Sequence, residues 1–220
     1  MRSHDDWALV FDLDGTLSDP LEGIARSYNH ALTAHGFEKR SDADLARLVG
    51  PPLDQGFLAL GVPRDRIVAA VATYRERYGE LGYAENRLYD GIHDVLMKLA
   101  RGGSRMGVCT SKRSDFAARI LAMFGLRELF SFVSGGDIGV TKAQQLRSLV
   151  DAGTINRRAL MIGDRAVDIQ AAKANGLASC GVLWGFGSRE ELAESQPDYL
   201  IATPVELLQF APSDPPLANA

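Results

Sequence analysis

Short, continuous apolar runs alternate with amphipathic segments along most of this chain. The runs occupy residues 7–11, 106–109, 130–133, 159–162, 179–183 and 199–201. Continuous hydrophobicity of this length is typical of strands buried on both faces, as in a parallel sheet. Between the runs, apolar residues recur at the three- and four-residue steps of a helix. This alternation predicts βαβ units and therefore an α/β fold with a doubly wound parallel sheet.

One long interval, from residue 18 to about 88, breaks the alternation because it contains no convincing strand. It carries helical stripes instead, at Leu21, Ile24, Tyr28 and Leu32, and at Ile67, Val71, Tyr74 and Tyr78. The Gly50-Pro51-Pro52 segment interrupts this helical pattern, because consecutive prolines cannot continue a helix. We therefore expect an all-helical domain over 18–85, inserted into a core domain made of 1–17 and 86–220.

Composition narrows the class of protein. The 220 residues are 46% hydrophobic and 24% charged, which is typical of a globular chain. The net charge of -4 gives no electrostatic reason to expect nucleic acid or a membrane surface as a partner. Cys109 and Cys180 each lie in an apolar run, which favours buried thiols over a disulfide. With no membrane-spanning apolar stretch and no signal-peptide layout, we expect a cytoplasmic monomer or homodimer.

Polar side chains follow three of the apolar runs, at the point where each predicted strand ends. They are Asp12-Leu13-Asp14-Gly15-Thr16, then Thr110-Ser111-Lys112, then Gly163-Asp164 with Asp168 four residues on. Ligands of an open parallel sheet bind at this edge, where the strand order reverses. Carboxylates gathered there repel one another unless a cation joins them. Oxygen ligands favour a hard ion, so the sequence predicts a Mg²⁺ site.

The Asp12 and Asp14 pair is the sharpest of these signals. A helix cap explains one aspartate after a strand, but hardly two. Alternate residues of a strand point the same way, so an Asp-x-Asp pair at a strand end directs both carboxylates toward one place. Gly15 then allows a tight exit from the strand.

Four ordered segments resemble the motifs of the haloacid dehalogenase superfamily, in its phosphatase branch. They are residues 11–17 (Phe-Asp-Leu-Asp-Gly-Thr-Leu), Thr110-Ser111-Lys112, Lys142 and residues 163–168. The chain is most similar to phosphoglycolate phosphatase-like proteins, which have a Rossmann-like core and a helical cap of the C1 type. Two further segments look like that group, namely Gly50-Pro51-Pro52-Leu53 and residues 181–185.

The resemblance implies a phosphatase that acts on a small phosphorylated metabolite, with 2-phosphoglycolate as the first candidate. Asp12 is then the nucleophile that forms an aspartyl phosphate. Asp14 is the general acid and base, which calls for a pKa raised toward neutrality. Mg²⁺ is expected on Asp12, the backbone carbonyl of Asp14 and Asp164, with Asp168 in support. Thr110, or Ser111 in its place, and Lys142 are expected to hold the phosphate.

Substrate selectivity is expected from the inserted helices, which close over the site. The candidates are Arg47, Gly50 and Pro51 at the helix break and Arg113 on the core side. A β-phosphoglucomutase-like phosphomutase shares all four motifs and stays open as an alternative. A phosphoacceptor or regulatory domain is the alternative outside enzymes, although its nucleophile would come later in the chain. Dehalogenase chemistry needs neither the metal nor the second acid, so Asp14 argues against it.

Overall fold

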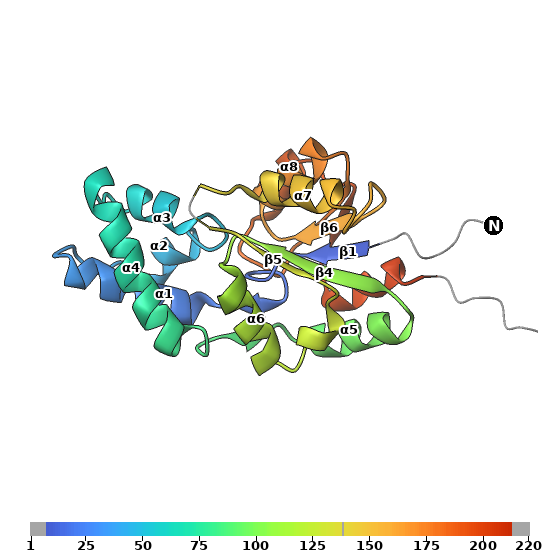
Figure 1. Ribbon diagram of the computed structural model, residues 1–220, viewed down its shortest axis with the longest axis horizontal. Helices are drawn as coiled ribbons and strands as arrows, with labels where there is room; N and C mark the ends of the chain where they lie inside the picture. The colour runs from blue at the N-terminus through green and yellow to red at the C-terminus, as the bar shows by residue number, and fades with distance from the viewer. Residues whose placement is uncertain (1–7, 138, 213–220) are drawn as a thin grey trace, which may run out of the picture.

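A six-stranded parallel sheet forms the centre of the computed structural model, which describes residues 8–137 and 139–212 (Figure 1). The strand order is β5-β4-β1-β6-β7-β8, and each of the five pairings is parallel. The strands are β1 (Ala8–Phe11), β4 (Arg105–Thr110), β5 (Val133–Gly135), β6 (Leu160–Gly163), β7 (Ala178–Val182) and β8 (Tyr199–Ile201). The expected doubly wound α/β fold is confirmed.

The strand order reverses at β1. From β1 the chain passes to β4 and β5 on one side, and then crosses to β6, β7 and β8 on the other. Phe11, the last residue of β1, pairs with Val108 of β4 and with Ile162 of β6. The residues that follow these three strands therefore meet at one edge of the sheet, which is where an open α/β sheet binds its ligand.

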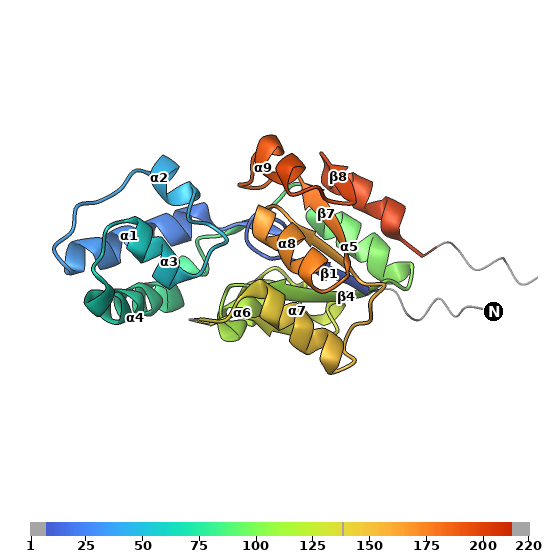
Figure 2. The same ribbon diagram turned by 90° about the horizontal axis from the view of Figure 1, so that it is seen from above.

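Helices cover both faces of the sheet, as Figures 1 and 2 show. Leu9 and Phe11 pack with the core residues of α5 (Ile92–Arg101) and α6 (Ser114–Met123). Val10 and Cys109 face the opposite layer, with α7 (Lys142–Asp151) and α8 (Ala166–Ala174). Alternate strand residues point to opposite faces, so each strand is apolar along its whole length. The described chain ends with α9 (Arg189–Glu194) and the 3₁₀ helix η5 (Pro204–Phe210).

The interval between β1 and α5 is helical and lies beyond one end of the sheet (Figure 1). It comprises α1 (Leu21–Ala34), α2 (Asp42–Ala46), α3 (Leu53–Ala59), the 3₁₀ turn η2 (Arg64–Arg66), α4 (Ile67–Arg77) and the π turn η3 (Tyr78–Gly82). The stripe residues of α1 and α4 are buried against each other, among them Tyr28, Leu32, Val71 and Tyr74. The Gly50-Pro51-Pro52 segment separates α2 from α3, as expected.

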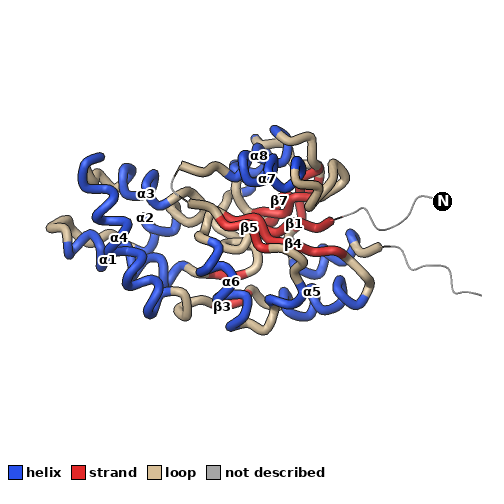
Figure 3. The backbone as a smooth tube through the Cα atoms, in the orientation of Figure 1, coloured by secondary structure: helices blue, strands red, loops and turns tan. Residues whose placement is uncertain are grey.

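Two details differ from the expectations. The helical interval does contain strand, because β2 (Ser18–Asp19) and β3 (Arg87–Leu88) pair antiparallel where the interval leaves and rejoins the core (Figure 3). The strand expected at 130–133 instead spans 133–135. The preceding residues form the 3₁₀ turn η4 (Arg127–Leu129), and the Phe130 N–H donates a hydrogen bond to the Arg127 carbonyl, so Phe130 still belongs to the turn. Both differences come from hydrogen bonds that hydrophobic periodicity does not encode. Within the described residues, no helix has both the length and the apolarity needed to cross a membrane.

Candidate active site

Three buried carboxylates converge at the edge where the strand order reverses. Asp12 follows β1, Asp164 follows β6, and Asp168 lies in the first turn of α8. Each offers an oxygen, and these oxygens lie within 4.8 Å of one another. All three side chains are almost completely buried. The expected convergence of Asp12 and Asp164 from two neighbouring strands is therefore present.

The turn after β1 shapes one side of this carboxylate cluster. The Leu13 carbonyl accepts hydrogen bonds from the backbone N–H groups of Leu17 and Ser18, at 2.9 and 3.1 Å. Gly15 has a φ of +89°, and a Cβ there would overlap the Asp164 carboxylate. Glycine is needed at this position for both its backbone conformation and the close approach.

Asp164 is held in place by donors from two sides. Phe186 N–H donates to Asp164 Oδ2 at 2.8 Å, and Thr16 Oγ1 donates to Oδ1 at 3.3 Å. The Trp184 indole N–H donates to the Thr16 carbonyl at 3.0 Å. The segment after β7 thus fixes the turn after β1 and the carboxylate that faces it.

Lys142 places its ammonium group inside the cluster. Nζ lies 3.0 Å from Asp12 Oδ1 and forms an ion pair with Asp168. Lys142 is the first residue of α7, whose start is fixed by a capping box between Thr141 and Gln144. Burial works against the charged form, but Asp12 and Asp168 outweigh it and raise the pKa of Lys142. The lysine therefore stays protonated within the cluster.

One ammonium does not balance three carboxylates. Burial, together with Asp168 and Asp12, raises the pKa of Asp164 to about 8. Burial also raises the pKa of Asp168 against the effect of Lys142. The donors are all carboxylate oxygens, which a hard divalent cation prefers. In both charge and donor chemistry, the residues present fit Mg²⁺.

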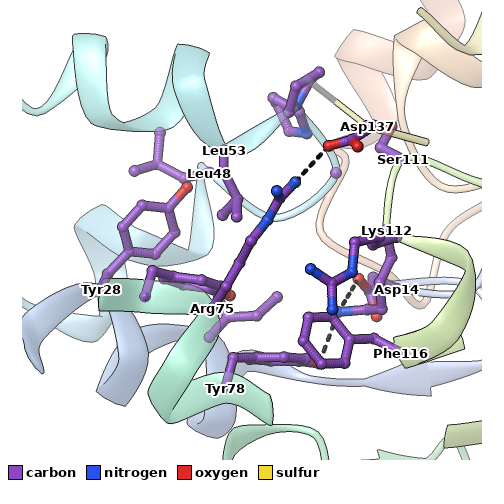
Figure 4. A pocket seen from close by; sticks show the side chains of 16 residues that line it. Asp14, Tyr28, Leu48, Leu53, Arg75, Tyr78, Ser111, Lys112, Phe116 and Asp137 are labelled. Carbon is purple, nitrogen blue, oxygen red and sulfur yellow. Dashed lines mark hydrogen bonds and ion pairs between the residues drawn. The ribbon is translucent and has the colours of Figure 1, made fainter. Parts of the chain in front are cut away.

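The Asp14 carboxylate occupies a separate position. Because β1 ends at Phe11, strand alternation does not extend to Asp14, whose Oδ2 lies 2.8 Å from Lys112 Nζ. Lys112 Nζ also donates to the Tyr78 hydroxyl at 2.7 Å (Figure 4). Burial raises the pKa of Asp14, and Lys112 opposes part of that rise. A raised pKa is the direction that a general acid at this position requires.

A pocket opens beside Asp14, between the core and the helical interval (Figure 4). The empty space around it, counting the open solvent at its mouth, is about 660 Å³. Of the residues expected to bind phosphate or substrate, Ser111, Arg113, Gly50 and Pro51 line it. Arg47 is exposed at the end of α2 and is not among the described lining residues.

Thr110 lies buried at the end of β4, beside Ser111. Its Oγ1 accepts a hydrogen bond from Lys112 N–H at 3.2 Å, and its carbonyl accepts one from Gln145 Nε2 at 3.1 Å. Cys109, the preceding residue, points into the layer of α7 and α8 and is fully buried. Burial raises the pKa of the Cys109 thiol to about 12, so this thiol is not a nucleophile near neutral pH.

Several residues in or near the pocket have no role assigned to them in the sequence analysis. Lys112 forms an ion pair with Asp14. Its position directly after Thr110-Ser111 is the sequence feature that could have identified it as a site residue. Arg165 reaches from the core to the helical interval, where Nη1 donates to the Val49 carbonyl at 2.5 Å, and it lies within the 163–168 motif. Tyr78 and Tyr28 belong to helical stripes that indicate core packing, so no sequence signal distinguishes them.

The fold and the site define an α/β enzyme with an acidic centre at the point of strand reversal. The family model for haloacid dehalogenase-like hydrolases matches residues 9–182. A 5'-nucleotidase from Pseudomonas aeruginosa is 40% identical over 210 residues, covering 93% of this chain and 95% of that protein. The tyrosine-protein kinase PtkA of Mycobacterium tuberculosis is 36% identical over 184 residues, covering 81% of this chain and 62% of that protein.

Among solved structures, a predicted phosphatase from Clostridium acetobutylicum matches with a TM-score of 0.87 at 34% identity. The match covers 93% of this chain and 96% of that one. The chain belongs to the haloacid dehalogenase-like hydrolase family. Within that family it is a phosphatase.

Proposed function

We propose that this protein is a Mg²⁺-dependent phosphatase that hydrolyses a small phosphomonoester through an aspartyl phosphate on Asp12. The observation that carries the proposal is the buried Asp12 carboxylate, which lies 3.0 Å from the Lys142 ammonium and beside Asp164 and Asp168. A phosphate dianion about 4 Å from a carboxylate is repelled by roughly 8 kcal/mol at an effective dielectric near 20. Attack by Asp12 therefore needs positive charge at this place.

The chain's own residues divide the reaction between them. An Asp12 oxygen forms a bond to phosphorus while the bond from phosphorus to the leaving oxygen breaks, with its electron pair staying on that oxygen. Asp14 gives the leaving oxygen a proton and later takes one from the water that releases phosphate. Lys142, with the Thr110 or Ser111 hydroxyl, stabilises the phosphate oxygens.

Asp12, the Asp14 carbonyl and Asp164 would hold Mg²⁺, with Asp168 in support. When bound, the ion supplies positive charge to the phosphate oxygens and allows the carboxylates to stay ionised together. The raised pKa of Asp164 is the observation that supports this assignment.

We also propose that residues 18–85 act as a cap domain on a core of 1–17 and 86–220. The two antiparallel strands β2 and β3 join the cap to the core. Contacts from Arg165 to the Val49 carbonyl and from Lys112 to Tyr78 hold it over the site. A cap in this position excludes water while Asp12 attacks.

The substrate candidates are 2-phosphoglycolate, from the resemblance of the motifs, and a nucleoside 5'-monophosphate, from the name of the Pseudomonas relative. Names of relatives do not select between them, because one fold supports several activities. The part of the pocket that contacts the leaving group determines which substrate is accepted.

Phosphate release from p-nitrophenyl phosphate tests the reaction without assuming the substrate. We expect release with Mg²⁺, none with a chelator and none from Asp12→Asn. Asp94→Asn is the matched control, because the Asp94 side chain is 84% exposed on α5, and it should keep full activity. Mass spectrometry of the rapidly quenched enzyme should show one added phosphoryl group that Asp12→Asn lacks. Turnover by Asp12→Asn at the rate of the unaltered protein would refute the proposal.

A further inference from the structure

The pocket continues from Asp14 into the helical interval, where its walls are mostly apolar. The walls there come from Ile24, Leu48, Pro51, Pro52, Leu53 and Tyr74. Tyr74 is stacked on Tyr78, with ring centroids 5.6 Å apart and planes 9° from parallel. A leaving group of two carbons and a carboxylate is strongly hydrated and matches apolar walls poorly. A leaving group with an apolar face would match them.

Tyr28 supplies a polar atom to this apolar region. The side chain is 1% exposed, and its hydroxyl has no hydrogen-bond partner in the part of the chain that the structure describes. Figure 4 shows this hydroxyl directed toward Leu48 and Leu53, which line the pocket. Asp14 Oδ1, at the other end of the same pocket, is also buried without a hydrogen bond to a described residue. Buried polar atoms without a partner are uncommon, and a functional role or an ordered water or ion is among the usual reasons.

Arg75 crosses the pocket between these two atoms. It extends from α4 toward Asp137, with Tyr28 on one side and Lys112 and Asp14 on the other (Figure 4). Arg75 Nη2 lies 2.6 Å from Asp137 Oδ1, and the arginine side chain is 23% exposed. The ion pair engages one edge of the guanidinium, and the arginine side chain lines the pocket. Guanidinium planes stack on aromatic rings and on nucleobases.

We infer that the leaving group carries a planar heteroaromatic ring, as in a nucleoside monophosphate, which stacks on Arg75 and hydrogen-bonds to the Tyr28 hydroxyl. The inference rests on the proposed function and deepens it, because it names the class of phosphomonoester. Arg75 and Tyr28 are then specificity-determining residues that touch the substrate away from phosphorus. Such contacts act mainly on substrate binding, so they should change KM more than kcat.

The first measurement compares AMP and UMP with 2-phosphoglycolate as substrates of the unaltered protein. We expect kcat/KM to be at least tenfold higher for the two nucleotides. Equal values, or a preference for 2-phosphoglycolate, would overturn the inference and leave the phosphatase proposal standing. Failure to release phosphate from any ester, p-nitrophenyl phosphate included, would instead contradict the proposed function itself.

Two conservative variants test the named residues. Tyr28→Phe removes only the hydroxyl and should raise KM for AMP about fivefold, the effect of one ordinary hydrogen bond. Arg75→Lys keeps the positive charge but removes the planar guanidinium group, and it should raise KM for AMP about tenfold. Both variants should lower kcat/KM for AMP by a larger factor than kcat/KM for 2-phosphoglycolate.

The matched controls are Tyr199→Phe on β8 and Arg101→Lys at the end of α5, both of which are exposed and do not line the pocket. They should behave as the unaltered protein. If Tyr28→Phe and Arg75→Lys weaken AMP and 2-phosphoglycolate equally, the two residues only hold the pocket together and the inference is wrong. A normal melting temperature for Tyr28→Phe shows that the variant is folded, since it removes a hydroxyl with no described partner.

Discussion

Lys142 Nζ lies 3.0 Å from Asp12 Oδ1 and also contacts the Asp168 carboxylate, so one buried cation is shared by two carboxylates from different elements. The lysine enters from the start of α7, while Asp12 follows β1 and Asp168 belongs to α8. This shared ammonium links the layer of α7 and α8 to the centre of the sheet. It therefore affects both the stability of the fold and the charge available to a phosphate.

Lys142→Met should lower both the free energy of unfolding and kcat. Removing one partner of a buried ion pair costs about 3–5 kcal/mol in the free energy of unfolding. Loss of a preorganised charge should lower kcat by about 10²- to 10³-fold. Mg²⁺ should restore part of the melting temperature but not the turnover. Lys98→Met, at an exposed position on α5, is the control and should change neither. A kcat within threefold of the unaltered protein would contradict the role of Lys142.

Gly15→Ala should disturb the carboxylate cluster, and Gly36→Ala provides a matched control. Both glycines have positive φ, +89° and +78°, so both substitutions carry a backbone strain of about 1–2 kcal/mol. A Cβ at Gly36 meets no atom within 4 Å, whereas one at Gly15 overlaps Asp164. Gly15→Ala should therefore lose more stability and also lose the increase in melting temperature that Mg²⁺ gives. An equal loss of stability in the two variants would show that backbone strain alone, and not contact with Asp164, causes the effect.

The stability of the metal-free protein should depend on pH through Asp164. Its pKa is raised to about 8 in the folded protein, above the ordinary value of 3.8. The folded state therefore binds more protons than the unfolded state between these values, and the free energy of unfolding falls as pH rises. This carboxyl contributes at most about 1.4 kcal/mol per pH unit.

Melting curves between pH 5 and pH 8 measure this slope. We expect a shallower slope in Asp164→Asn, and a larger stabilisation by Mg²⁺ at pH 8 than at pH 5. A slope that Asp164→Asn leaves unchanged would assign the pH dependence to other groups.

Lys112→Met should move the pH profile of catalysis. Asp14 must be protonated to act on the leaving group, so kcat/KM should fall as pH rises through its pKa. Lys112, 2.8 Å from Asp14, lowers this pKa against the effect of burial. Its removal should raise the pKa and shift the alkaline limb of the profile to higher pH. A shift to lower pH would mean that the limb reports another group.

Much of the fold can be predicted because its pattern is local. Strands buried on both faces are continuous apolar runs, and this property gave the place of β4, β6, β7 and β8 to within a residue or two. The site follows in part, because parallel strands end at one edge of the sheet, which brings Asp12 and Asp164 together. The short strands that begin at Ser18 and Arg87 cannot be predicted in this way, because two-residue strands leave no periodic signal.

The amino-acid sequence by itself determined where most of the strands and helices lie and which polar side chains follow the strands, because both depend on neighbours along the chain. Only the tertiary structure decided that Lys142 lies between Asp12 and Asp168, that Asp14 pairs with Lys112, and that Tyr28 and Arg75 line the pocket. These relationships join residues that are far apart in sequence. They depend on how whole helices pack against the sheet, which no local pattern specifies.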